Sequence, residues 1–84
     1  MASHRGLLHL NKLEDFALWC ANVKGWVRCD TKGYYEKLRM RHVNHASPVI
    51  LYATAHSAHL TIPMEGMAYV LYQQWQAAQR KGGA

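Results

Sequence analysis

Residues 34–62 read YYEKLRMRHVNHASPVILYATAHSAHLTI, and this stretch combines alternating polarity with turn-forming residues. In its first part, apolar Leu38 and Met40 alternate with basic residues, the period-two pattern of a β-strand with one buried and one solvated face. The basic residues are Lys37, Arg39 and Arg41. We therefore predict that one face of the protein's sheet is basic.

A second, more apolar strand follows the basic one. Residues 44–48, NHASP, are turn formers, and residues 49–53, VILYA, are apolar throughout. A continuous apolar run of this length is typical of a strand in the middle of a sheet. The stretch thus predicts a hairpin with a basic outer strand and a buried inner strand.

Two shorter strands flank the predicted hairpin. Residues 26–29, WVRC, have the composition of a strand and lead into a turn that begins at Asp30 and ends at Gly33. Residues 59–62, HLTI, alternate in polarity after a small polar segment. The sheet should therefore have three or four strands.

Helical patterns lie on both sides of these strands. Residues 11–24 begin at Asn11, a favoured N-cap, and stop before Gly25. Their apolar stripe is Leu13, Phe16, Ala17 and Cys20. A second helix is predicted from Pro63, which suits a first turn, to Arg80. Its apolar stripe is Met64, Met67, Leu71, Trp75 and Ala78.

This order of elements predicts an α+β fold: a helix, a three- or four-stranded antiparallel sheet and a second helix, with both helices packed on one face of the sheet. A chain of 84 residues has the size of a single small domain. Residues 1–10 show no settled period and are predicted to be a loose N-terminal arm. Residues 81–84 are predicted to be a flexible tail.

The net charge and the cysteine content indicate which kind of partner and which cellular compartment to expect. Lys and Arg number 10 against 5 acids, which gives a formal charge of +5 and favours acidic proteins or nucleic acids as partners. The chain shows neither a secretory signal nor an apolar run that could span a membrane, so no membrane association is expected. Cys20 and Cys29 are then expected to be free thiols in a cytoplasm.

The basic strand is the predicted binding site. By alternation its basic residues share one face with an aromatic residue that could stack on a partner. The predicted binding residues are Tyr35, Lys37, Arg39 and Arg41. Glu36 would then lie on the opposite face with Leu38 and Met40, where a carboxylate needs a partner. Arg28 on the neighbouring strand is the predicted partner of Glu36.

The sequence does not predict catalysis, a metal or a cofactor. His42 with His45 and His56 with His59 are closely spaced, but the available cysteines form no Cys-x-x-Cys knuckle that could complete a zinc site. The run His42-Val43-Asn44-His45 contains the residue types of His-Asn-His nucleases, crowded into one turn. No serine has the flanking residues of a nucleophile elbow. A non-enzymatic protein is therefore predicted.

Three segments together resemble a protein family. They are TKGYYEKLRMRH, then PVILY, then HLTI. Over residues 13–62 the chain is similar to short open reading frames of tailed bacteriophages, which implies a phage accessory protein in the cytoplasm of the bacterial host. Those proteins carry Arg-Arg after the apolar strand, whereas this chain has Ala53-Thr54-Ala55, so the resemblance does not imply a second basic patch.

Two functional hypotheses follow. The first is a non-enzymatic inhibitor that binds and occludes a host macromolecule, namely a host protein, or a protein–nucleic acid complex, of a nucleic-acid-handling or defence system. The alternative is direct binding of DNA or RNA through the basic strand. A homodimer is also left open, formed through an exposed edge at residues 59–62 or through the apolar residues 49–53.

Overall fold

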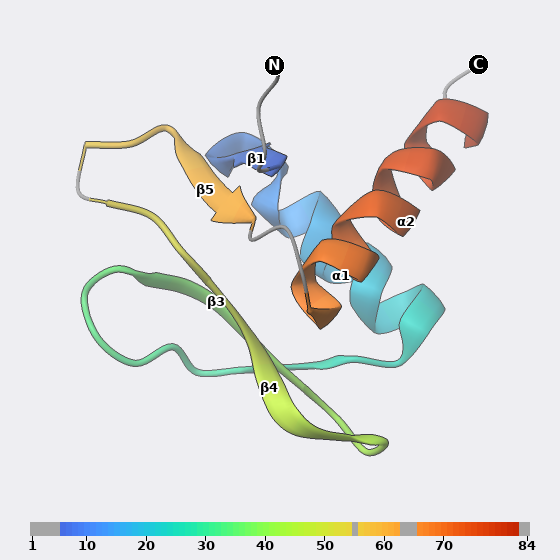
Figure 1. Ribbon diagram of the computed structural model, residues 1–84, viewed down its shortest axis with the longest axis horizontal. Helices are drawn as coiled ribbons and strands as arrows, with labels where there is room; N and C mark the ends of the chain where they lie inside the picture. Colours follow the sequence, from blue (N-terminus) through green and yellow to red (C-terminus); the bar gives the residue numbers. More distant parts are fainter. Residues whose placement is uncertain (1–5, 55, 63–65, 83–84) are drawn as a thin grey trace.

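The computed structural model describes residues 6–54, 56–62 and 66–82 as an α+β fold with a curled antiparallel sheet and two helices (Figure 1). The elements, in chain order, are β1 (Gly6–His9), a 3₁₀ helix η1 (Leu10–Lys12), α1 (Leu13–Lys24), β2 (Val27–Cys29), β3 (Glu36–His42), β4 (His45–Tyr52), β5 (His59–Ile62) and α2 (Met67–Gly82). The five strands are ordered β1-β5-β4-β3-β2.

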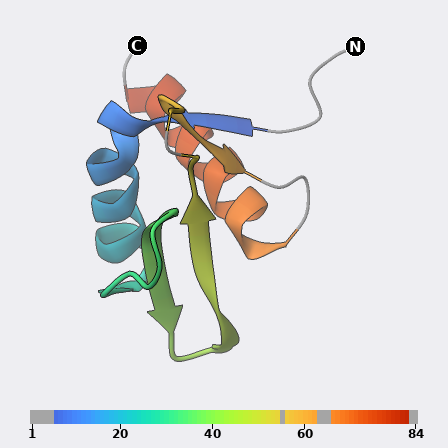
Figure 2. The same ribbon diagram turned by 90° about the vertical axis from the view of Figure 1, so that its left-hand side faces the viewer.

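The sheet bends sharply between β4 and β5. These strands pair only at Tyr52 and Thr61, whereas β1 and β5 pair along their whole length from Gly6 with Ile62 to His9 with His59. Figure 2 shows the β1–β5 ribbon crossing above the β3–β4 hairpin at a steep angle. The sheet therefore consists of two antiparallel parts that meet at one residue pair.

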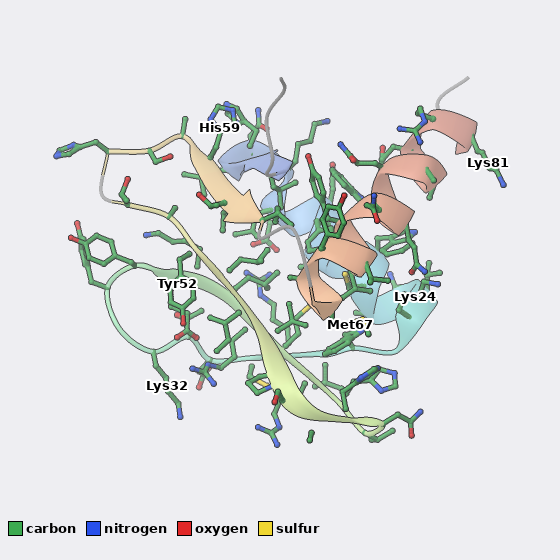
Figure 3. The ribbon with its side chains drawn as sticks, in the orientation of Figure 1. Lys24, Lys32, Tyr52, His59, Met67 and Lys81 are labelled. Carbon is green, nitrogen blue, oxygen red and sulfur yellow. The ribbon has the colours of Figure 1, made fainter. Side chains whose placement is uncertain are left out.

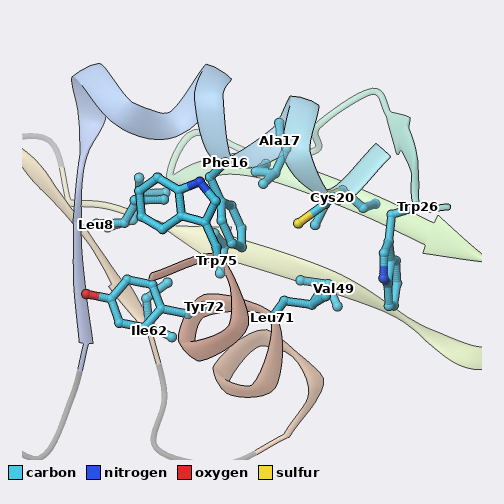
Figure 4. Close-up of a cluster of buried hydrophobic side chains, with 14 of the residues drawn as sticks. Leu8, Phe16, Ala17, Cys20, Trp26, Val49, Ile62, Leu71, Tyr72 and Trp75 are labelled. Carbon is cyan, nitrogen blue, oxygen red and sulfur yellow. The ribbon is translucent and has the colours of Figure 1, made fainter. Parts of the chain in front are cut away.

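One hydrophobic core joins the helices to the inner face of both parts of the sheet (Figure 4). The strands contribute Leu8, Leu38, Met40, Val49, Leu51, Leu60 and Ile62. The helices contribute Phe16, Ala17, Cys20, Leu71, Tyr72 and Trp75. Of the predicted helical stripes, Phe16, Ala17, Cys20, Leu71 and Trp75 are buried, whereas Leu13, Met67 and Ala78 are only partly buried. Met64 lies outside the described residues.

The amino-terminal segment was predicted wrongly. Residues 6–9 form strand β1 instead of part of a loose arm, because Leu8 packs opposite Leu60 in the core. The partner strand lies about fifty residues further along the chain, so no local pattern marks this pairing. The edge of β5 that we expected to pair two copies is consequently covered by β1 within one chain.

The helix limits also differ from the predictions. Asn11 is not the N-cap of α1: it lies in η1, and its backbone N–H donates to His9 Nδ1 at 3.2 Å. The chain leaves β1 through this tight turn, so α1 starts at Leu13. Helix α2 extends into the predicted tail, with Arg80 and Lys81 in its last turn, where cations are favourable. The predicted start at Pro63 falls outside the described residues.

Gly25 ends α1 in a left-handed conformation with φ of 80°. The backbone N–H of Trp26 donates to the Cys20 carbonyl at 3.1 Å, as in a Schellman-type stop. We expect Gly25→Ala to lower the free energy of unfolding by about 1 kcal/mol, since an L-residue is strained at this φ. Urea unfolding at neutral pH measures the loss.

The matched control for Gly25 is Gly33, which has φ of 79°. A Cβ at Gly33 meets nothing within 4 Å, and one at Gly25 meets only the His42 ring, at ordinary distances of 3.5 Å from Nε2 and 3.9 Å from Cδ2. Both alanine variants should therefore lose similar stability, through backbone strain alone. A Gly25→Ala variant as stable as the parent would contradict this account.

Candidate binding surface

A bulge in β3 determines which side chains reach the outer face of the sheet, the face turned away from the core. Glu36 pairs with Tyr52 and Leu38 pairs with Leu51, so Lys37 is an extra residue without a partner in β4. Paired residues of antiparallel strands lie on the same face. The bulge therefore places Glu36 on the outer face, and its predicted position beside Leu38 and Met40 is wrong.

Glu36 is bound there by Arg39. Arg39 Nε donates to Glu36 Oε2 at 2.6 Å, and Nη2 donates to Oε1 at 3.1 Å. The Glu36 residue is only 7% exposed, so the pair is largely removed from water. The Arg39 hydrogen bond lowers the pKa of Glu36, aided by the backbone N–H of Lys32, although burial acts in the opposite direction. Arg39 is consequently neutralised by its own strand.

Arg28, the predicted partner of Glu36, binds a different acid. It pairs in register with Met40 and so lies on the face of the sheet that carries α1 and α2. Arg28 Nη1 lies 2.7 Å from Glu14 Oε1 on α1. Both side chains are exposed, so this ion pair contributes little to stability. The predicted Arg28–Glu36 pair is wrong because the bulge moved Glu36 to the other face.

The remaining predicted binding residues lie at two separate places on the outer face. Lys37 Nζ lies 5.7 Å from the centroid of the Tyr34 ring, which in turn makes an edge contact with Tyr35 at 4.9 Å. Arg41 lies nearer the hairpin end, opposite the exposed Val27 of β2. In the described part of the chain, no hydrogen bond or ion pair holds the Arg41 side chain. The three cations do not form one continuous free stripe.

Tyrosines are more prominent on this surface than the sequence indicated. Tyr34, Tyr35 and Tyr52 are 71%, 51% and 53% exposed. Tyr52 was predicted in a buried strand, because it stands in the apolar run of residues 49–53. It is exposed because β4 alternates along this run, with Val49 and Leu51 facing the core and Tyr52 facing outward. Figure 3 shows Tyr52 and Lys32 at the same end of the molecule. We call Tyr34, Tyr35, Lys37 and Tyr52 the tyrosine surface.

A hollow opens beside the tyrosine surface, where β4 and β5 diverge. Its volume is about 320 Å³. The lining residues are Tyr35, Tyr52, Ala53, Thr54 and Thr61. Beyond Tyr52 the chain stays alongside the segment that precedes β3, since the Ala53 N–H donates to the Tyr35 carbonyl at 3.0 Å. Small side chains on both separating segments leave the space between the two tyrosines unfilled.

The other end of the hairpin is occupied by aromatic packing. His42 and His45 flank the turn as predicted, but the turn is Val43-Asn44 and β4 already begins at His45. A register shift between Met40 and His42 accommodates the additional β4 residues. The His45 ring stacks on Trp26 with centroids 5.2 Å apart.

Both ring nitrogens of His42 are engaged. Nδ1 accepts the Asn44 backbone N–H at 3.0 Å, so Nε2 carries the proton and donates to the Lys24 carbonyl at 3.0 Å. Within residues 6–54, 56–62 and 66–82, no cluster of three or more His, Cys, Asp or Glu could hold a metal ion. Both cysteines are free, and burial raises the pKa of the Cys20 thiol to about 12.

Comparison with protein-family models, curated proteins and solved structures finds no match for this chain. In the described part of the chain, neither helix is both long and apolar enough to cross a membrane.

Proposed function

We propose that this chain is a non-enzymatic binding protein that docks a partner protein on its tyrosine surface. One observation carries the proposal: the central cation of the basic strand, Arg39, is neutralised by Glu36, which pairs across the strands with the exposed Tyr52. Tyrosine and arginine are enriched at protein interfaces, lysine is depleted, and the rim around the interface core is polar and solvent-accessible. The surface is rich in tyrosine, and Lys37 beside the Tyr34 ring is its polar margin.

A phosphate backbone would need a different surface. Nucleic-acid affinity arises mainly from neutralising successive phosphates with free Lys and Arg side chains. Here the free cations Lys37 and Arg41 are separated by an internal ion pair. Exposed tyrosines instead offer large, rigid contact areas with a polar tip, which suits a protein partner.

The resemblance to short phage reading frames adds the biological setting. In that setting the partner is a protein of the bacterial host that handles nucleic acid or takes part in defence, and binding would inhibit it by occlusion. Direct binding of nucleic acid remains the competing hypothesis, supported by the formal charge of +5.

Affinity capture from a bacterial lysate tests the proposal. We expect the immobilised protein to retain one host protein after nuclease treatment and at raised salt. The double variant Tyr34→Ser/Tyr52→Ser should lose it by more than tenfold, since aromatic anchors dominate interface energies. The control is Val43→Ser, because Val43 is 94% exposed at the hairpin turn, away from the tyrosine surface.

The same experiment can overturn the proposal. Capture that disappears with nuclease would indicate nucleic-acid binding. So would an affinity that falls by about one log unit per log unit of salt for each phosphate contact. Full capture by the double tyrosine variant would place the interface elsewhere.

A further inference from the structure

We infer that the hollow between Tyr35, Tyr52 and Thr61 receives one apolar side chain from an acidic segment of the partner, whose carboxylate binds Lys37. The inference rests on the proposed function and specifies the chemistry of the partner.

The hollow has the dimensions of an anchor site. Its volume of about 320 Å³ is at the small end of ligand pockets, which span roughly 300–1,000 Å³, and so fits one large side chain. Ala53, Thr54 and Thr61 contribute short side chains, and the rings of Tyr35 and Tyr52 line the same hollow. Binding energy in protein interfaces concentrates where one side chain fills such a pocket.

The lining favours an apolar occupant over a nucleobase. The polar side-chain atoms available are hydroxyl groups of two tyrosines and two threonines, and no charged or amide side chain lines the hollow. A base would bury several polar edge atoms without enough partners, which is costly. A leucine or phenylalanine side chain carries no such cost and gains the burial of its apolar area.

The charges around the hollow favour an acidic segment. Lys37 contacts the Tyr34 ring, and Tyr34 contacts Tyr35 in the lining. Lys32 lies close to Glu36, the residue paired with Tyr52. Among the described acids, Glu14 and Glu36 are bound to arginines. The other two, Asp15 and Asp30, do not line the hollow. A carboxylate on the partner would therefore find free lysine and no competing acid in the lining.

Capped dipeptides probe this site directly by NMR titration. N-acetyl-Phe-Asp-amide should give saturable amide shifts at Tyr35, Tyr52, Ala53 and Thr61. N-acetyl-Phe-Lys-amide should bind about 2–5-fold more weakly, the range expected for one exposed ion pair. N-acetyl-Ala-Asp-amide should bind about tenfold more weakly, because it lacks the buried ring.

Substitutions in the lining can fill the hollow without destabilising the fold, so a loss of binding can be distinguished from a loss of folding. Thr61 and Thr54 are exposed, so Thr61→Leu or Thr54→Leu should fill the hollow and remove Phe-Asp binding without lowering the urea midpoint. Thr61→Val, which keeps the shape of threonine, should retain binding. Lys37→Gln should retain Phe binding and abolish the preference for Asp over Lys.

Several results would overturn the inference. One is equal affinity for N-acetyl-Phe-Asp-amide and N-acetyl-Phe-Lys-amide. Another is binding of N-acetyl-Phe-Asp-amide that survives both leucine variants. The third is uridine monophosphate that binds at the same amides more tightly than N-acetyl-Phe-Asp-amide. Lysate capture distinguishes this failure from that of the proposed function. If Thr61→Leu still captures the host protein while Tyr34→Ser/Tyr52→Ser does not, the tyrosine surface stands and the anchor site is wrong.

Discussion

Replacement of Trp75 by alanine is expected to leave most of the chain unfolded at 37 °C. The indole is buried and packs edge-on against Phe16, with centroids 5.5 Å apart, and beside Tyr72 at 6.4 Å. Figure 4 shows Trp75 at the centre of the contact between α1 and α2. Removing a buried tryptophan costs about 3–5 kcal/mol. A domain of this length sits near the low end of the ~5–15 kcal/mol stability range.

Trp75→Phe is the matched variant and should remain folded. In the described part of the chain, Trp75 Nε1 has no hydrogen-bond partner, so its removal leaves no other group unpaired. The phenyl ring still fills part of the space and the edge contact. Circular dichroism during thermal unfolding measures both variants, with Val43→Ser as the exposed control. A Trp75→Ala protein that melts with the parent would show that the two helices do not share this core.

The second large effect concerns the Glu36–Arg39 ion pair. Because Arg39 holds the pKa of Glu36 below its ordinary value of 4.5, the pair contributes stability that is complete above that value. This contribution is lost as the pH falls through the lower folded-state pKa. We expect Glu36→Gln to lower the melting temperature by about 5 °C or more at pH 7, and the gap to the parent to narrow near pH 3.

Arg39→Glu provides the sharper contrast. It places two carboxylates together, so the loss should be greatest at pH 7 and should shrink on acidification as one of them takes up a proton. Glu14→Gln is the control, since Arg28 also lowers the pKa of Glu14 but the pair is exposed and its loss should be smaller. A pH-independent gap between Arg39→Glu and the parent would contradict the ion-pair account.

Much of the fold could be predicted because its signals are local. The stripe of Phe16 and Cys20 marked α1, and alternation marked β3 and β5 within a few residues of their ends. Strand β1 could not be found in this way, since Leu8 becomes a core residue only when Leu60 lies beside it. Pairing between distant segments depends on the whole chain.

The candidate site was predicted less well than the fold. Alternation correctly placed Leu38 and Met40 in the core. One extra residue at Lys37 reversed the face of Glu36, and this changed the role of Arg39 from a surface cation to half of an ion pair. A bulge of one residue shifts every side chain beyond it, but it leaves no mark on composition or on the polarity of its neighbours. Tyr52 is exposed for a different reason: β4 alternates even though its sequence is apolar throughout, so Leu51 faces the core and Tyr52 faces outward.

The single pair that joins β4 to β5 also affects how the molecule opens. Strands β1 and β5 share four residue pairs with each other, while among the described residues only the pair Tyr52–Thr61 joins their ribbon to the rest of the sheet. The backbone thus offers little resistance to separation of the ribbon as a unit, and the burial of Leu8, Leu60 and Ile62 against the helices opposes it instead. In hydrogen exchange, amides of the ribbon would then exchange together, as one cooperative unit distinct from the β3–β4 hairpin. The hollow lies at this seam, so a partner that fills it would also clamp the two units together.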